Sequence, residues 1–264
     1  MSWPNGGRDE GPDELLTRLQ AAARVQFMKI PTMAKLFDHS ILRPDATRRE
    51  VVGFAETAVR LKTASLMLQP CNLRFAAEVL KGSGVLLASV IGFPHGNETA
   101  TMKEYQAREV LRLGAEEIDM VMNIPALKNN EKSLFFADIE GVVRAAQGFQ
   151  VKVILENCLL NDEEKRRACE WIAQTGAAFV KTSTGFAAGG ATVADVRLMC
   201  AAVAGKCEVK AAGGVRTVGE VLAFLRAGAR RFGSTRSDKI IEEYREMTAD
   251  QRQDFGEFVT DLGV

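Results

Sequence analysis

Histidine is scarce in this sequence: His39 and His95 are the only two among 264 residues. Metal sites built from three or four histidines are therefore excluded, which disfavours a zinc-dependent enzyme. An excess of positive charge is also missing, because 34 lysines and arginines balance 34 aspartates and glutamates. Without that excess we expect neither nucleic acid nor an anionic membrane as partner. No apolar run approaches the roughly 18 residues of a membrane span, and no secretion signal opens the chain.

Cysteine pairs of the C-x-x-C type are absent as well. With 47% hydrophobic and 26% charged residues, the composition is that of a globular protein long enough to bury a sizeable core. Isolated cysteines in such a chain are most simply the reduced thiols of a cytoplasmic protein. The five cysteines are Cys71, Cys158, Cys169, Cys200 and Cys207.

Short apolar runs alternate with amphipathic helical segments from residue 34 onward. Most of these runs are apolar on both faces, which is typical of a parallel sheet covered by helices. The eight predicted strands cover residues 34–40, 64–70, 85–93, 116–124, 149–157, 177–183, 207–214 and 230–236.

Glycines recur just before the predicted strands, where the end of a helix favours a backbone with positive φ. Eight β-α units of about 30 residues each have the length of an α/β fold of the (β/α)8 TIM-barrel type. A doubly wound open sheet is the alternative, but its first strand would normally lead into a glycine-rich turn, and residues 38–41 contain no glycine. The recurring glycines are Gly84, Gly114, Gly148, Gly176, Gly205 and Gly228.

The chain ahead of the first strand has a different character. Residues 1–12 are polar and rich in Gly and Pro, and apolar residues at helical spacing follow at Leu15, Leu16, Leu19 and Ala23. We therefore predict a tail and a covering helix over residues 1–34. Since no interior linker interrupts the β-α rhythm, residues 35–264 are predicted to form a single barrel domain.

Four consecutive predicted strands each carry an ionisable side chain within an apolar run. These residues are Asp119, Lys152, Lys181 and Lys210. A buried charge is costly unless it is paired, so structural ion pairs are one interpretation. For Lys152, the simplest partner is Glu156, four residues further along the same predicted strand.

Three lysines and an aspartate on adjacent strands favour a chemical role over a purely structural one. Burial or a neighbouring ammonium lowers the pKa of a lysine, and the free amine can then attack a carbonyl to form a Schiff base. Asp119 would move protons on and off the intermediates. Spacing alone does not decide whether Lys181 or Lys210 is the nucleophile.

Two turns after the last predicted strands have the composition of phosphate-binding turns. Each combines glycine with hydroxyl side chains or exposed backbone N–H groups ahead of a helix, at the usual phosphate position of this fold. The candidate residues are Gly213, Gly214, Gly233, Ser234 and Thr235, with Gly185 as a third wall. His39 and His95 are weaker candidates, and a structural hydrogen bond is an equally good interpretation of His39.

These segments together resemble the deoxyribose-phosphate aldolase family of class I, Schiff-base-forming aldolases. The resemblance covers roughly residues 35–240 and is most specific in KTSTGF and in VKAAGGVRT. It implies reversible cleavage of 2-deoxy-D-ribose 5-phosphate to D-glyceraldehyde 3-phosphate and acetaldehyde, with no metal and no cofactor. The implied partner is a small-molecule sugar phosphate, and the implied setting is deoxyribonucleotide catabolism by a cytoplasmic homo-oligomer, a dimer or a tetramer. The matching segments are FDHSILRPDAT, VIGFPHG, GAEEIDMVMNI, VKVILE, FVKTSTGF, VKAAGGVRT and RFGSTRS.

The resemblance also implies a role for each candidate residue. Lys181 would form the Schiff base, Lys210 would perturb its pKa, and Asp119 would be the proton donor and acceptor. Asp38 and Lys152 would line the pocket. The phosphate-binding turns would comprise Gly185, Gly213, Gly214, Gly233, Ser234 and Thr235.

The sequence departs from the family pattern at positions near the expected substrate. Met67 and Gln69 differ in the second predicted strand, Phe186 stands where some members have a lysine, and Arg236 occupies a turn position often filled by serine. A Schiff-base aldolase of the same fold with a different sugar-phosphate substrate is therefore an alternative. A catalytically silent sugar-phosphate-binding barrel is a second, which the complete set of Asp119, Lys181 and Lys210 disfavours.

Overall fold

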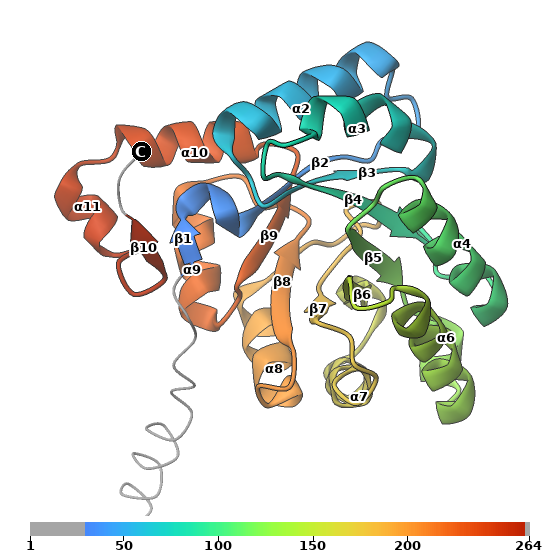
Figure 1. The fold of residues 1–264 in the computed structure, drawn as a ribbon. Helices are drawn as coiled ribbons and strands as arrows, with labels where there is room; N and C mark the ends of the chain where they lie inside the picture. The colour runs from blue at the N-terminus through green and yellow to red at the C-terminus, as the bar shows by residue number, and fades with distance from the viewer. Residues whose placement is uncertain (1–29, 262–264) are drawn as a thin grey trace, which may run out of the picture.

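Eight parallel strands close into a barrel in the computed structural model, which describes residues 30–261 (Figure 1). Each strand pairs with the next along the chain, and the last pairs with the first. The predicted TIM barrel is therefore confirmed, and the open doubly wound sheet is excluded. The barrel strands are β2 (Phe37–Ile41), β3 (Ser65–Leu68), β4 (Leu86–Ile91), β5 (Glu117–Val121), β6 (Gln150–Ile154), β7 (Phe179–Lys181), β8 (Glu208–Ala212) and β9 (Arg231–Ser234).

Helices surround the barrel and connect successive strands (Figure 1). The longer helices are α2 (Arg48–Leu61), α3 (Leu73–Leu80), α4 (Ala100–Arg112), α6 (Lys132–Ala145), α7 (Asp162–Ile172), α8 (Val193–Val203), α9 (Val218–Ala227) and α10 (Ser237–Glu246). The short ones are α5 (Ile124–Lys128), α11 (Ala249–Gln253) and the 3-10 turns η1 (Met33–Leu36), η2 (Pro70–Asn72) and η3 (Asn157–Leu159). A separate two-stranded parallel pair joins β1 (Ile30–Thr32) to β10 (Val259–Asp261).

Local sequence signals account for where the helices begin and end. Helix α9 starts in a capping box, in which the Thr217 side chain accepts from the backbone of Glu220 and the Glu220 carboxylate accepts from the backbone of Thr217. Such caps are typically worth about 1 kcal/mol each. The same helix ends at Gly228, whose φ of 113° is unfavourable for a residue with a side chain. All six glycines predicted to precede strands have positive φ.

The hydrophobic core lies mainly between the outer face of the barrel and the helices. Inside the barrel the two sides differ. A small apolar cluster of Leu42, Met67, Ala88 and Val90 occupies the side of β3 and β4. The remaining strands turn charged side chains inward, so the barrel interior is polarised between a hydrophobic side and an ionic side.

The first predicted strand was placed too early in the chain. Residues 33–36 form a 3-10 turn that begins after Thr32, whose side chain accepts from the backbone of Lys35, and β2 starts only at Phe37. The predicted covering helix lies outside the described residues, and the division at residue 34 stays a prediction.

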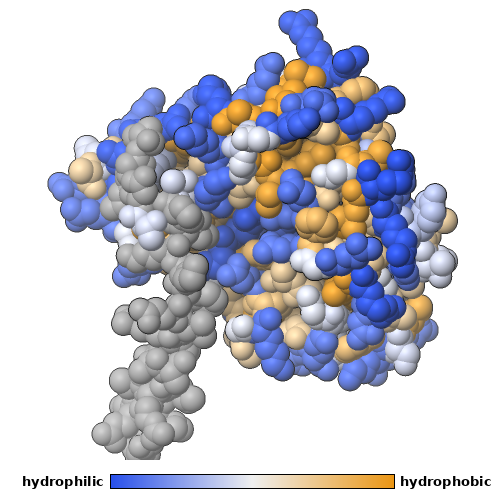
Figure 2. Space-filling model, in the orientation of Figure 1, coloured by the Kyte–Doolittle hydropathy of each residue, from blue (hydrophilic) through white to orange (hydrophobic). Residues whose placement is uncertain are grey.

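The face drawn in Figure 2 is mostly polar, and hydrophobic side chains gather on it between α3 and α4. Over residues 30–261, none of the helices combines the length and the apolar character that crossing a membrane requires.

Candidate active site

The ionisable residues predicted on consecutive strands meet inside the barrel. In the register of the sheet, Asp119 of β5 lies beside Lys152 of β6, and Lys181 of β7 lies beside Lys210 of β8. All four residues are 0–3% exposed. The sequence prediction that these residues share one site is consistent with this arrangement, because neighbours in register point to the same side of the sheet.

Asp119 is the centre of the cluster. Its Oδ2 lies 2.7 Å from Nζ of Lys181 and 2.6 Å from Nζ of Lys210. Its Oδ1 lies 3.2 Å from Nζ of Lys152. One carboxylate is thus shared by three ammonium groups, an arrangement that holds the three lysines together.

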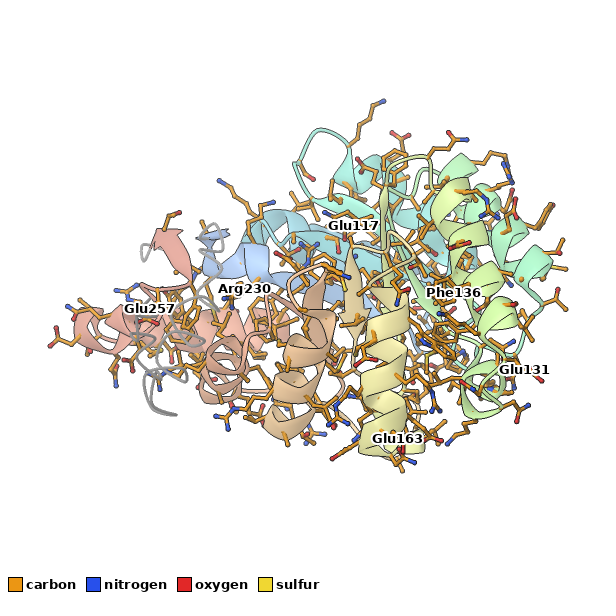
Figure 3. The ribbon with its side chains drawn as sticks, turned by 90° about the horizontal axis from the view of Figure 1, so that it is seen from below. Glu117, Glu131, Phe136, Glu163, Arg230 and Glu257 are labelled. Carbon is orange, nitrogen blue, oxygen red and sulfur yellow. The ribbon has the colours of Figure 1, made fainter. Side chains whose placement is uncertain are left out.

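Three more charged side chains lie deeper in the barrel: Asp38 of β2, Glu117 of β5 and Arg231 of β9. The Arg231 guanidinium donates to Oδ1 of Asp38 at 2.6 Å and to Oε2 of Glu117 at 3.0 Å. Lys152 lies 2.7 Å from Glu117, and Lys210 forms an ion pair with Asp38. In Figure 3, Glu117 lies toward the centre of the molecule, whereas Glu131 and Glu163 lie at its edge.

The environment shifts the pKa values of the central pair. Burial lowers the pKa of Lys181 to about 8; the Asp119 carboxylate opposes this shift and the Lys210 charge adds to it. Burial alone would raise the pKa of Asp119, but the charges of Lys152, Lys181 and Lys210 outweigh it and keep that pKa below its ordinary value. Asp119 is therefore ionised near neutral pH, and a substantial fraction of Lys181 is neutral at moderately alkaline pH.

Sequence reasoning missed Glu117 and Arg231. Each stands at the start of a strand beside another charged residue, Glu116 or Arg230. In the sequence, such a charged pair looks like the exposed end of a strand. The signal that could have found them is parity: Glu117 is two residues from Asp119, and Arg231 is two from Gly233. Alternate residues of a strand point to the same face.

Two of the predicted pocket residues occupy a different place than the resemblance implies. Asp38 and Lys152 are fully buried in the ionic network, beneath the pocket rather than along its wall. The predicted pairing of Lys152 with Glu156 is wrong. Strand β6 ends at Ile154, and Glu156 adopts a left-handed backbone (φ 51°) that brings its carboxylate to the hydroxyl and the N–H of Thr184.

A pocket of about 410 Å³ opens at the carboxyl ends of β7, β8, β9 and β2. Lys181 is the one lysine among the residues that line it, and the predicted turn residues line it too. The structure thus brings Lys181 together with Gly185, Gly213, Gly214, Gly233, Ser234 and Thr235.

The glycine turn after β8 has an unusual backbone and unused donors. Gly213 and Gly214 have φ values of 84° and 83°. A Cβ at neighbouring Gly190 would lie 2.3 Å from the carbonyl oxygen of Gly213, so the two loops approach too closely for a side chain there. Within residues 30–261, the backbone N–H groups of Gly213, Gly214 and Val215 donate to no other group. These donors are available to an anion in the pocket.

Ser234 has a structural part in the same pocket. Its hydroxyl donates to the carbonyl of Val215 at 2.9 Å and accepts from the N–H of Arg236 at 3.0 Å. The side chain therefore links the two turns to each other and is already engaged before any ligand arrives.

Positive charge surrounds the pocket. Arg43, Arg216 and Arg236 line it, and no aspartate or glutamate stands among its lining residues. With Lys181 at its floor, the pocket offers cations and backbone donors to a ligand, which suits a phosphate-bearing molecule.

The remaining candidates lie elsewhere. His39 points away from the barrel interior: its Nδ1 is 2.6 Å from Oγ of Ser237, and its ring stacks on Phe54. The structural interpretation of His39 is thus the one that fits. His95 lines a second pocket of about 310 Å³, which shares Thr184 and Phe186 with the first.

Comparison with known proteins agrees with this geometry. Residues 32–236 match the profile of the DeoC/LacD family aldolases. A deoxyribose-phosphate aldolase of Staphylococcus saprophyticus is 47% identical over 209 residues, which cover 79% of this chain and 95% of the relative. The enzyme of that name from Streptococcus sanguinis is 47% identical over 76% of this chain and 91% of its own.

A solved structure shows the same likeness in three dimensions. The tetrameric deoxyribose phosphate aldolase of Aeropyrum pernix superposes with a TM-score of 0.75 at 28% identity, covering 81% of this chain and 92% of the other. The family match over residues 32–236 spans every barrel strand, from β2 to β9. The chain therefore belongs to the DeoC/LacD family of aldolases and is an aldolase, a carbon–carbon lyase.

Proposed function

We propose that this enzyme cleaves 2-deoxy-D-ribose 5-phosphate reversibly to D-glyceraldehyde 3-phosphate and acetaldehyde, through a Schiff base on Lys181. The observation that carries the proposal is the place of Lys181: a buried amine at the floor of a cationic pocket, with a pKa near 8. The names of the curated relatives support the substrate.

The ion pairs favour Lys181 over the other two lysines as the nucleophile. Lys210 contacts the carboxylates of both Asp38 and Asp119, and Lys152 contacts Glu117 and Asp119. Among residues 30–261, Lys181 has Asp119 as its single carboxylate partner. The least neutralised ammonium loses its proton most easily, and its free amine is the nucleophile that reaches the pocket.

The chemistry then follows in balanced steps. The Lys181 amine adds to the C1 carbonyl of the open-chain sugar, and loss of water gives an iminium. A base removes the proton of the C3 hydroxyl, the C2–C3 bond breaks, and its electron pair moves to the iminium to form an enamine. Glyceraldehyde 3-phosphate leaves with the C3 carbonyl. Protonation of the enamine at C2 and addition of water release acetaldehyde and the free amine.

Asp119 is the proposed proton carrier. Its Oδ2 is 2.7 Å from the Lys181 nitrogen, and its pKa is held below the ordinary value. It therefore starts the cycle as a carboxylate, able to accept a proton. Lys210 donates a hydrogen bond to the same oxygen at 2.6 Å. Its charge repels the Lys181 ammonium, and it can return the proton that Asp119 has accepted.

The 5-phosphate is assigned to the turns after β8 and β9. The unpaired N–H groups of Gly213, Gly214 and Val215 supply oriented donors, and Arg216 and Arg236 supply charge. Gly185, Gly233 and Thr235 shape the same wall. The Ser234 hydroxyl keeps the two turns in register with each other.

A substrate panel tests the proposed substrate against the alternative sugar phosphate. We expect 2-deoxyribose 5-phosphate to have the highest kcat/KM, with acetaldehyde detected as product. A higher kcat/KM for another phosphorylated sugar, such as one with a 2-hydroxyl, would favour the alternative. Absence of carbon–carbon cleavage with every sugar phosphate would reject the catalytic proposal altogether.

We further propose that the enzyme acts as a homo-oligomer in the cytoplasm. The tetrameric relative from Aeropyrum pernix supports self-association, and the five free cysteines suit a reducing compartment. Light scattering coupled to size-exclusion chromatography measures the mass of the particle. A mass of one chain at micromolar concentration would contradict the oligomer.

A further inference from the structure

Six charged side chains in the barrel interior form a closed ring in which acids and bases alternate. Each neighbouring pair in the ring is an ion pair with an N···O distance of 3.2 Å or less. Going around, the members are Asp119, Lys152, Glu117, Arg231, Asp38 and Lys210, which contacts Asp119 again. Three carboxylates thus meet three cations, and Lys181 is the seventh group, attached to Asp119 from outside the ring.

We infer that Arg231 and Glu117 are positioning residues that close this ring and thereby make Lys181 the surplus cation of the barrel interior. The inference rests on the proposed function, because it assigns these residues a part in the Schiff-base chemistry of Lys181. Neither residue lines the pocket, so both act through the groups that they hold.

Arg231 and Glu117 act along two arms. In one arm, Arg231 binds Oδ1 of Asp38, and the other oxygen of Asp38 holds Lys210 against Asp119. In the other arm, Glu117 binds Lys152 at 2.7 Å, and Lys152 reaches Oδ1 of Asp119. Both arms end on Asp119, the partner of Lys181. With the ring balanced by itself, the charge of Lys181 is uncompensated, so its proton is lost more easily.

The ring holds the charged groups that form ion pairs beside Lys181, whereas Glu208 of β8 and Lys35, which interact electrostatically with Arg231, lie outside it. The facing groups are Asp38 on β2, Glu117 and Asp119 on β5, Lys152 on β6, Lys210 on β8 and Arg231 on β9. Strands β3 and β4 contribute the uncharged Met67, Ala88 and Val90. Arg43, Arg216 and Arg236 stand at the mouth of the pocket.

The charge count predicts shifts of opposite sign for two variants. Arg231→Met leaves the ring with one excess negative charge, which holds the proton on Lys181. Glu117→Gln leaves one excess positive charge, which expels it. In the pH profile of kcat/KM, we expect the acidic limb to move up by about one pH unit in R231M and down by about one unit in E117Q. The double variant restores the balance, and its limb returns close to the wild-type position.

Neighbouring residues that face away from the interior provide matched controls. Arg230 donates to the backbone carbonyls of Leu225 and Ala229, and the Glu116 carboxylate accepts from the backbone of Leu87. Arg230→Met and Glu116→Gln should leave the limb where it is. Arg231→Lys, which keeps the charge, should also keep the limb near its wild-type pH even where its thermal stability falls.

The outcomes separate this inference from the proposed function. If the wild-type enzyme cleaves no sugar phosphate, the proposed function fails. If it does, but R231M and E117Q lower kcat without moving the limb, or move it in the same direction, the inference is overturned. If R231M does not fold, the E117Q arm decides: a downward shift supports the ring, and an unchanged or upward limb refutes it.

Discussion

Lys181 and Asp119 form an ion pair of 2.7 Å across the barrel interior, from strand β7 to strand β5. The same carboxylate oxygen also binds Lys210 at 2.6 Å. Because Asp119 is divided among several ammonium groups, it stabilises the charge of Lys181 less than a dedicated partner would. The proposed proton acceptor, Asp119, is thus in direct contact with the proposed nucleophile, Lys181.

The first prediction concerns pH. A protonated amine cannot attack a carbonyl, so activity requires the neutral form of Lys181, whose pKa burial lowers to about 8. We expect kcat/KM to rise with pH up to about pH 8 and then level off, with about tenfold less activity at pH 7 than on the plateau. A profile that is flat from pH 6 to pH 9 would show that some other step limits the reaction.

The second prediction separates proton transfer from iminium formation. Asp119→Asn keeps the shape of the side chain but removes its basicity, so we expect kcat for cleavage to fall by about two to four orders of magnitude. The free amine of Lys181 persists, because loss of the carboxylate favours the neutral form. Acetaldehyde should therefore still be captured on Lys181 by borohydride. A kcat within tenfold of wild type would remove Asp119 from the mechanism.

The third prediction tests the phosphate pocket. Charge-assisted hydrogen bonds are worth about 1.5–3 kcal/mol each, so Arg236→Glu should raise the KM for 2-deoxyribose 5-phosphate roughly ten- to a hundredfold. Unphosphorylated 2-deoxyribose should be affected little, since it has no group for that site. Arg245→Glu is the control, because Arg245 lies in the last turn of α10, the helix that Arg236 caps, and does not line the pocket. A parallel loss for both sugars would mean that Arg236 only supports the turn.

Sequence reasoning predicted the barrel well for a physical reason. Strands buried on both faces are mostly apolar, so the eight runs were recognisable, and the glycines before them had to adopt positive φ. Strand ends were less predictable, because polar residues such as Glu117 occur equally in loops. Residue 117 lies two positions before Asp119 and faces inward with it, but its significance depends on Arg231, which is 114 residues away.

The pairing of Glu156 illustrates what spacing cannot provide. A four-residue interval places two side chains on the same face only while the strand continues. Here β6 ends at Ile154, and the left-handed backbone at Glu156 redirects the carboxylate toward Thr184. The phosphate turns were easier to recognise, because the glycines that the backbone requires are visible in the sequence.

The fourth prediction concerns stability in acid. Burial lowers the pKa of His39 to about 4, whereas an unfolded chain binds this proton near pH 6.5. The unfolded state therefore takes up the proton first as the pH falls, and the free energy of unfolding drops between about pH 6.5 and 4 by up to about 3 kcal/mol. In denaturant titrations across that pH window, the free energy of unfolding of His39→Asn should depend less on pH than that of the wild type. An identical pH dependence in both proteins would show that His39 does not contribute.

The central claim is that the amine of Lys181 becomes covalently bound to the substrate. Borohydride reduction during turnover of 2-deoxyribose 5-phosphate, followed by peptide mass spectrometry, measures this directly. We predict one reduced adduct, located on Lys181, and its loss together with all turnover in Lys181→Ala. An adduct on Lys210 or Lys152 in the wild-type enzyme, or undiminished cleavage by the Lys181→Ala variant, would contradict the assignment.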